Sequence, residues 1–269
     1  MSTFRRIVIS LAVLAAVSAR LASAQPAPPA VTDAEFKCMA STSKAIGKFW
    51  NAKTKCVVRC LDKFWDGLVP ESDCLAPYGG ATAACVRDTV LFAKGAEDKM
   101  TIAIRKACDP TFKAGTDCPE CYSGGNCSAN SFAGDRTAEI ENMVDSFVPG
   151  VFCERAGAFY PLEMRCQTTT AKRIAKYVGA AGKCYDKCTS IARKGLIPFG
   201  DCTPPASDAV TQACLAKATA TAAYDIHHDC DPPPASPDNC GAPYPTGEEW
   251  TNLALVAVEG IVPSTYCAD

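Results

Sequence analysis

The sequence predicts an all-α protein built from two tandem, disulfide-stapled three-helix modules. Three features lead to this prediction: 18 cysteines in 269 residues, long segments with apolar residues at helical spacing, and a cysteine pattern that recurs in the second half of the chain. No segment alternates apolar and polar residues as a half-buried strand does.

The N-terminal segment has the features of a secretory signal peptide. Two arginines precede an apolar run from Ile7 to Val17, and the small residues Ala22 and Ala24 fit a cleavage site. We therefore expect residues 1–24 to be a signal peptide and residues 25–34 to be a linker. The protein is expected to be secreted or periplasmic.

The composition of the remaining chain argues against nucleic acid as a partner. Cleavage would remove three arginines and no acidic residue, which leaves 24 basic and 29 acidic side chains, a net charge of about −5. No later segment is long and apolar enough to span a membrane. All 18 cysteines remain, and an even, high cysteine count in an exported chain indicates disulfide bonds.

The cysteine spacing indicates an internal duplication. Four cysteines recur 128 positions later, and four more recur at similar places. The corresponding pairs are Cys38 and Cys166, Cys56 and Cys184, Cys60 and Cys188, Cys74 and Cys202, Cys85 and Cys214, Cys108 and Cys230, Cys118 and Cys240, and Cys153 and Cys267. We therefore predict repeat 1 at residues 35–157 and repeat 2 at residues 158–269.

Each repeat is predicted to contain three helices. In the first helix of repeat 1, apolar residues such as Ile46, Trp50 and Val57 fall on one arc, and in both repeats this helix ends at a glycine with a proline three residues later. The second helix is rich in alanine, and the third is expected to stop before Pro149 or Pro263. The ranges in repeats 1 and 2 are 35–66 and 163–194, then 82–107 and 207–229, then 135–147 and 247–260.

The disulfide pairing follows if the first two helices of a repeat form an antiparallel hairpin. Cys38 then faces Cys108, while one of Cys56 and Cys60 faces the second helix and the other faces the cysteine of the intervening loop. The spacing does not separate these two options, and we adopt the nested one. The two cysteines without a counterpart in repeat 2 flank a Gly-Gly turn and are expected to pair. The predicted disulfides are Cys38–Cys108, Cys56–Cys85, Cys60–Cys74, Cys118–Cys153, Cys121–Cys127, Cys166–Cys230, Cys184–Cys214, Cys188–Cys202 and Cys240–Cys267.

Three closely spaced cysteine pairs allow a metal or redox interpretation. They lie in KCVVRC (55–60), KCYDKC (183–188) and CPEC (118–121). Zinc would need two further thiolate or imidazole ligands, and a thioredoxin-type site would need a preceding strand that the sequence lacks. We therefore expect structural disulfides and neither a metal nor a cofactor.

The two histidines, His227 and His228, are the best candidates for ion binding. They could join neighbouring aspartates in a weak ion site, or they could be part of a polar helix end. We favour the polar helix end, because repeat 1 has Arg105 and Lys106 at these positions. No hydrolase elbow, zinc-protease motif or phosphate loop occurs, so we expect no catalytic residues and no enzyme activity.

Four basic positions recur on the first helix of each repeat. They span about 60° of the helix circumference, opposite the apolar arc. This basic stripe could be a solvated face that pairs with the acidic third helix, in which residues 135–145 include four acidic side chains, or it could bind an anionic surface. The stripe consists of Lys44, Lys48, Lys55, Arg59, Lys172, Lys176, Lys183 and Lys187.

The segment CMASTSKAIGKFWNAKTKCVVRC and its copy CQTTTAKRIAKYVGAAGKCYDKC resemble cysteine-rich helical repeats of secreted bacterial proteins. That group has no assigned function. The resemblance covers the first helix of each repeat and implies a secreted, all-α protein.

These observations favour a non-catalytic binding or structural protein. Its expected partner is an anionic envelope polymer or an acidic protein, contacted through the basic stripe. One alternative is a carrier that holds a small apolar ligand between its helices. The other is a secreted enzyme or ion-binding protein that uses His227 and His228.

Overall fold

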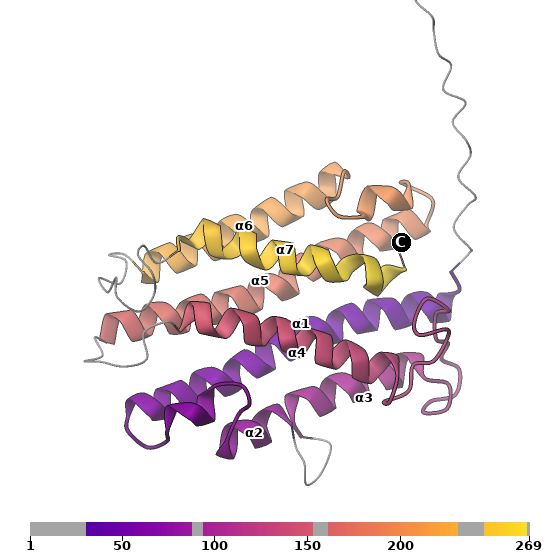
Figure 1. The fold of residues 1–269 in the computed structure, drawn as a ribbon. Coiled ribbons are helices and arrows are strands. Elements are labelled where there is room, and N and C mark those ends of the chain that lie inside the picture. The colour runs from indigo at the N-terminus through magenta and orange to yellow at the C-terminus, as the bar shows by residue number, and fades with distance from the viewer. Residues whose placement is uncertain (1–30, 88–93, 153–160, 231–244, 268–269) are drawn as a thin grey trace, which may run out of the picture. The chain divides into compact units, whose positions relative to one another are not determined.

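The computed structural model describes residues 31–87, 94–152, 161–230 and 245–267. These residues form helices and no strands (Figure 1), so the predicted all-α fold class is confirmed. The predicted signal peptide lies outside the described residues. In chain order the helices are α1 (Asp33–Trp65), η1 (Glu71–Cys74), α2 (Gly80–Val86), α3 (Ala96–Cys108), α4 (Phe132–Val151), α5 (Pro161–Arg193), η2 (Phe199–Cys202), α6 (Ala209–Asp229) and α7 (Gly247–Tyr266).

The two longest helices, α1 and α5, begin the two predicted repeats and end in the same way. α1 starts at a capping box in which Thr32 and Glu35 each accept a hydrogen bond from the other's backbone N–H. The helix therefore begins at Asp33, inside the segment predicted as linker. Beyond the last turns of α1 and α5, Gly67 and Gly195 adopt a left-handed backbone with φ of 71°, a conformation that terminates helices and favours glycine.

α1 and α5 pack against each other in antiparallel orientation. A Cβ atom on Gly47 would lie 3.0 Å from the Cα atom of Gly179, so the two backbones approach closely. Further along the pair, Asp33 of α1 forms an ion pair with Arg193 of α5. The absence of a side chain at the two glycines thus permits the close central packing.

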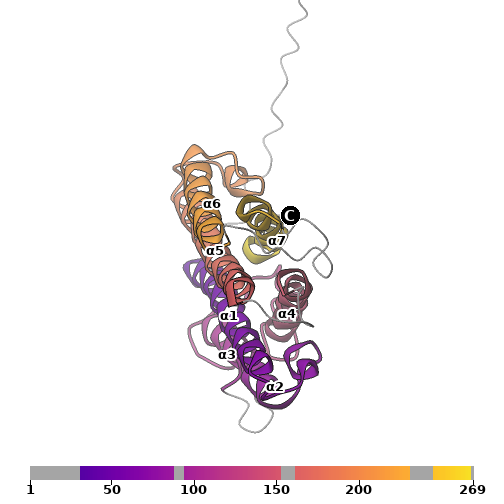
Figure 2. The same ribbon diagram turned by 90° about the vertical axis from the view of Figure 1, so that its left-hand side faces the viewer.

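The remaining helices build two layers around this pair. α3 packs on α1 and α6 packs on α5, which gives a layer in the order α6, α5, α1, α3. α4 and α7 cover one face of that layer (Figure 2). The core lies between the layers, where Trp50 meets Phe147 edge to face at a ring distance of 5.5 Å. None of the described helices combines the length and hydropathy that a membrane span needs.

The predicted second helix of repeat 1 is interrupted, which corrects the expectation of one helix over residues 82–107. α2 ends at Val86, Arg87 has an extended backbone, and α3 begins after Gly95. The N–H group of Gly95 bonds to the side chain of Asp98, which starts a new helix. Residues 88–93 lie outside the described residues. The counterpart in repeat 2, α6, is a single helix.

The predicted third helices are longer than expected. α4 reaches Val151 and α7 reaches Tyr266, so the expectation that they stop before a proline is wrong. In α7, Pro263 removes one backbone donor from the last turn, yet the N–H group of Cys267 still bonds to the Pro263 carbonyl, so the helix continues past the proline. The buried side chains of Thr265 and Tyr266 hold this turn against the core. Tertiary packing therefore overrides the local signal.

Eight disulfides lie among the described residues, and no described cysteine is free. Six of them occur at predicted pairs, and the two repeats use the same pattern. The Cα–Cα distance is 4.8 Å for both Cys38–Cys108 and its counterpart Cys166–Cys230. The other four are Cys56–Cys85, Cys60–Cys74, Cys184–Cys214 and Cys188–Cys202.

Three predicted pairings are wrong. Cys118 pairs with Cys127, so Cys118–Cys153 and Cys121–Cys127 do not form. Cys121 pairs with Cys267, so Cys240–Cys267 does not form. Residues 153 and 240 lie outside the described residues.

The prediction failed here because it closed every bridge within one repeat. In the structure the loop before α4 crosses to the end of α7. There the hydroxyl of Tyr122 donates to the carbonyl of Thr265, and the Tyr122 ring stacks on Phe132. This contact brings the Cα atoms of Cys121 and Cys267 to 5.8 Å, within the range that a disulfide spans.

Candidate functional site

A groove of about 590 Å³ lies between the N-terminal half of α1, the C-terminal half of α3 and the loop that follows α3. The groove is lined by lysines at its sides and by small residues at its floor. The walls carry Lys37, Lys44, Lys48, Lys106 and Lys113. The remaining lining residues are Ala34, Ser41, Ala45, Ala103, Ala107, Gly115 and Thr116. We call this site the lysine groove.

No acidic side chain lines the lysine groove, and none of its five lysines forms an ion pair with a described residue. The nearest compensation is for Lys44, which interacts with Asp186 of α5. Burial raises the pKa of Asp186, and the charges of Lys44 and Lys183 oppose that rise. Five cations around one concavity create a local positive potential even though the whole chain has a formal charge of −2.

The loop that carries Lys113 is held in shape by Asp109, which is 2% exposed. One carboxylate oxygen accepts from the Thr111 backbone N–H at 2.9 Å and from its hydroxyl, and the other accepts from Arg105 Nε at 3.0 Å. Burial alone would raise the pKa of Asp109, but these donors outweigh burial and the pKa lies below its ordinary value. The guanidinium of Arg105 also lies over the ring of Phe112, 4.3 Å from its centre.

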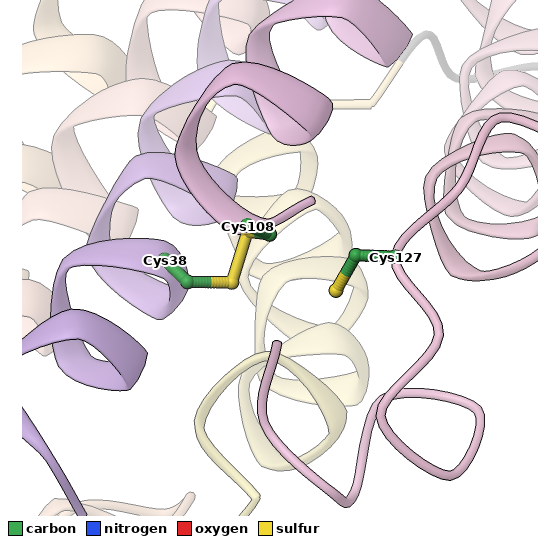
Figure 3. Close-up of side chains that lie close together, drawn as sticks. All are labelled: Cys38, Cys108 and Cys127. Atoms are coloured by element: carbon green, nitrogen blue, oxygen red, sulfur yellow. A yellow bond between two sulfur atoms is a disulfide. The ribbon is translucent and has the colours of Figure 1, made fainter. Parts of the chain in front are cut away.

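Disulfides secure both ends of this loop. Cys38–Cys108 fixes its start to α1, and Cys118–Cys127 fixes its end. The Sγ atoms of Cys38, Cys108 and Cys127 lie within 4.8 Å of one another (Figure 3), which resembles a metal-binding cluster in spacing. Each of these sulfurs is already in a disulfide, so none is a thiolate that could bind a metal. The cluster therefore has a structural role.

Equivalent contacts near the bridges Cys38–Cys108 and Cys166–Cys230 show which residues of α3 and α6 correspond. The Thr42 hydroxyl lies 3.7 Å from the Cys108 sulfur, and the Thr170 hydroxyl lies 3.7 Å from the Cys230 sulfur. Four residues before each of these cysteines, an isoleucine is fully buried, with exposed fractions of 0% and 1%. Residues 103 and 107 of α3 therefore correspond to residues 225 and 229 of α6.

At these equivalent positions the two repeats differ in charge. In repeat 2, Arg165 Nη2 lies 2.6 Å from an oxygen of Asp229, and Arg173 Nη1 lies 2.7 Å from an oxygen of Asp225. The hydrogen bond from Arg165 lowers the pKa of Asp229. Repeat 1 has alanine in place of both aspartates. The carboxylates that neutralise this face in repeat 2 are thus missing from the lysine groove.

All eight residues of the predicted basic stripe are exposed. Lys44 and Lys48 line the lysine groove, and the other six do not. The α1 half of the stripe faces away from α4: Lys53 contacts α4, and Lys55 lies two residues, about 200°, further around the helix. On α5, the charge of Lys172 acts on Asp62, whose pKa is raised mainly by burial.

The acidic third helix does not pair with the stripe. Glu141 and Asp145 of α4 lie 3.0 and 2.7 Å from the ammonium of Lys53, which is fully buried, and Asp145 also accepts from the Tyr78 hydroxyl. Glu139 instead pairs with Arg136. Sequence reasoning missed Lys53 because it lies among basic residues that are exposed.

The two histidines are not assembled into an ion site among the described residues. Both are exposed, and His228 Nδ1 lies 3.5 Å from Asp229, which already binds Arg165. The ring of His228 also lies near that of Tyr224, at 6.2 Å between centres. This geometry matches a polar helix end.

Three lysines of the groove, Lys37, Lys106 and Lys113, were not predicted as site residues. Lys37 precedes the stripe by two helical turns, and its counterpart in repeat 2 is the basic residue Arg165, so a comparison of the repeats could have revealed it. The same comparison shows alanines opposite Asp225 and Asp229. The contribution of Lys113 depends on the fold of a loop and carries no comparable signal.

Three comparisons with known proteins gave no match: no protein-family model, no curated protein and no solved structure is similar to this chain.

Proposed function

We propose that this protein is a non-catalytic binding protein of an oxidising compartment outside the cytoplasm, and that it binds an anionic polymer through the lysine groove. One observation carries the proposal: five lysines surround the groove without an ion-pair partner among the described residues. Charges of one sign in a concave site raise the local concentration of counter-charged ligands.

The arrangement of cations along α1 supports a linear ligand. Five cations are exposed along one side of α1, namely Lys37, Lys44, Lys48, Lys55 and Arg59. At 1.5 Å per residue this row extends over about 33 Å, which is longer than the groove residues of α1 alone. A polymer that enters the groove could therefore continue along the helix.

The disulfides support the proposed compartment. Eight bridges among the described residues indicate a chain that matures under oxidising conditions. This setting, secreted or periplasmic, is where envelope polymers occur. The groove has no aromatic lining residue on which bases could stack, in keeping with the expectation that nucleic acid is not the partner.

The alternative of an apolar carrier has less support. Two apolar pockets between the helices, one beside Trp50 and Val57 and one beside Ile46 and Val258, each have a volume of about 20 Å³. Such a space holds about one water molecule. The alternative of a histidine-based enzyme or ion site lacks an assembled set of groups.

The test is retention of the disulfide-intact protein on carboxylated, sulfated and neutral matrices as the salt concentration rises. We expect retention on an anionic matrix that is lost as salt screens the lysines. Lys44→Glu with Lys48→Glu should weaken it, whereas Lys194→Glu with Lys217→Glu, which makes the same charge change outside the groove, should not. Absence of salt-sensitive retention on every anionic matrix would refute the proposal.

A further inference from the structure

The difference between the repeats points to the chemical class of the ligand. Because it concerns the same groove, this inference rests on the proposed function. In repeat 2, α6 places two carboxylates against arginines of α5. In repeat 1, α3 has alanine at both places, and α1 has Lys37 where α5 has Arg165 but Ala45 where α5 has Arg173. The second cation that would meet a ligand carboxylate therefore comes from the other lysines of the groove.

We infer that the lysine groove binds a linear polyuronate, whose carboxylates take the places that Asp225 and Asp229 fill in repeat 2. The two aspartates are four residues apart on one helix face, so their side chains are separated by about 6 Å. A uronate chain presents one carboxylate per sugar and can offer two at such a separation. In repeat 2, the carboxylates of Asp225 and Asp229 therefore occupy the places that the ligand's carboxylates would take in repeat 1.

The groove suits a sugar chain better than an acidic peptide. Its floor consists of alanine, serine, glycine and threonine, which leaves no deep apolar pocket for a peptide side chain to fill. Peptides that bind by side-chain anchors or by strand addition need such pockets or an open strand edge, and the described residues contain no strand. An acidic peptide would thus have charge contacts alone. Hydroxyl groups of a sugar can bond to Ser41 and Thr116 while its carboxylates meet the lysines.

The site is also built before the ligand arrives. Asp109 and the disulfides Cys38–Cys108 and Cys118–Cys127 fix the loop that carries Lys113. A ligand that binds a prepared site loses less free energy to ordering the protein. Only the lysine side chains remain to be ordered on binding. The ligand's carboxylates attract their ammonium groups and offset the repulsion between them.

The experiment introduces the two aspartates of repeat 2 at the equivalent positions of the lysine groove. The disulfide-intact protein is titrated calorimetrically with oligogalacturonate, with its methyl ester as the uncharged control. We expect binding of the free acid only. Ala103→Asp with Ala107→Asp should weaken this binding at least about tenfold, or about 1.4 kcal/mol, because the new carboxylates occupy the lysines.

The matched control is Ala103→Asn with Ala107→Asn, which adds similar volume without charge. It should bind within about twofold of the wild type, a difference well under 1.4 kcal/mol. Equal weakening by the Asp and Asn variants would mean that size and not charge blocks the groove, and would overturn the inference. So would wild-type affinity in the Asp variant.

Two further probes separate this inference from the proposed function. Dextran sulfate or poly-glutamate that binds in the groove while oligogalacturonate does not would overturn the polyuronate assignment and leave the proposed function intact. If none of these anionic polymers binds, both fail. Thermal melting of each variant confirms that it is folded.

Discussion

Ala107 and Asp229 occupy equivalent positions in the two repeats, each one residue before the cysteine that ties its helix to a long central helix. Asp229 lies 2.6 Å from Arg165, whereas the alanine leaves Lys37 without a carboxylate partner. Together with Ala103 and Asp225, this pair of positions separates a face neutralised by its own carboxylates from an open, cationic one.

Removal of the internal carboxylates should open a second anion site. In the variant Asp225→Ala with Asp229→Ala, Arg165 and Arg173 lose their partners and become available to ligand. We expect the number of oligogalacturonate chains bound per protein to rise, measured by calorimetric titration. Glu248→Ala, an exposed acid at the start of α7, is the control. An unchanged stoichiometry would contradict the idea that the aspartates block this face.

The conformation of the loop that carries Lys113 should depend on Asp109. Asp109→Ala removes the acceptor for Thr111 and Arg105. We expect the free energy of unfolding to fall by about 1–3 kcal/mol, the usual cost of a buried partner lost, and the affinity for anionic polymer to fall as Lys113 moves. Asp117→Ala, an exposed acid of the same loop, should change neither quantity. Denaturant unfolding and binding titrations measure both effects, and wild-type affinity in Asp109→Ala would show that the loop is not needed.

The buried ammonium of Lys53 should be essential for stability and unrelated to binding. Lys53→Met leaves Glu141 and Asp145 without their shared cation. Such a loss costs about 3–5 kcal/mol. Lys55→Met, two residues further and exposed, should stay within about 0.5 kcal/mol of the wild type. If chemical denaturation shows equal stability for both variants, Lys53 does not neutralise these carboxylates.

The carboxyl of Glu97 should make stability depend on pH. Burial, the hydrogen bond with Glu141 and the charge of Glu141 raise its pKa from 4.5 to about 8, while Lys53 and Arg87 oppose the rise. Between these values the folded protein holds a proton that the unfolded chain has released. The stabilisation is therefore complete below pH 4.5 and is lost as pH approaches about 8.

The test for Glu97 is the variant Glu97→Gln, which cannot titrate. We expect its free energy of unfolding to decline less than that of the wild type across this pH window, measured by denaturant unfolding at several pH values. Glu248→Gln should follow the wild-type curve. Parallel curves for the wild type and Glu97→Gln would contradict a raised pKa.

The sequence was informative where local pattern and repetition decide the outcome. The apolar arc of α1, the terminating glycines and the spacing of Cys38 and Cys108 all depend on residues within one hairpin, and the fold class followed from them. The exposed faces of Lys44 and Lys48 followed from helical periodicity.

What could not be predicted depends on contacts between distant segments. Cys121 pairs with Cys267 because Tyr122 docks on the end of α7, and no spacing rule contains that contact. The last turn of α7 persists beyond Pro263 because buried neighbours hold it. The lysine groove needs Lys113 from a loop whose path only the fold defines.

The most direct test of the central claim is a zero-length carbodiimide cross-link between oligogalacturonate and the lysines of the disulfide-intact protein, mapped by peptide mass spectrometry. Carboxylates couple only to amines that they contact, so the products locate the ligand. We predict sugar adducts concentrated on Lys37, Lys44, Lys48, Lys106 and Lys113 and suppressed by high salt. Adducts spread evenly over all exposed lysines, or concentrated on Lys194 and Lys217, would contradict binding in the lysine groove.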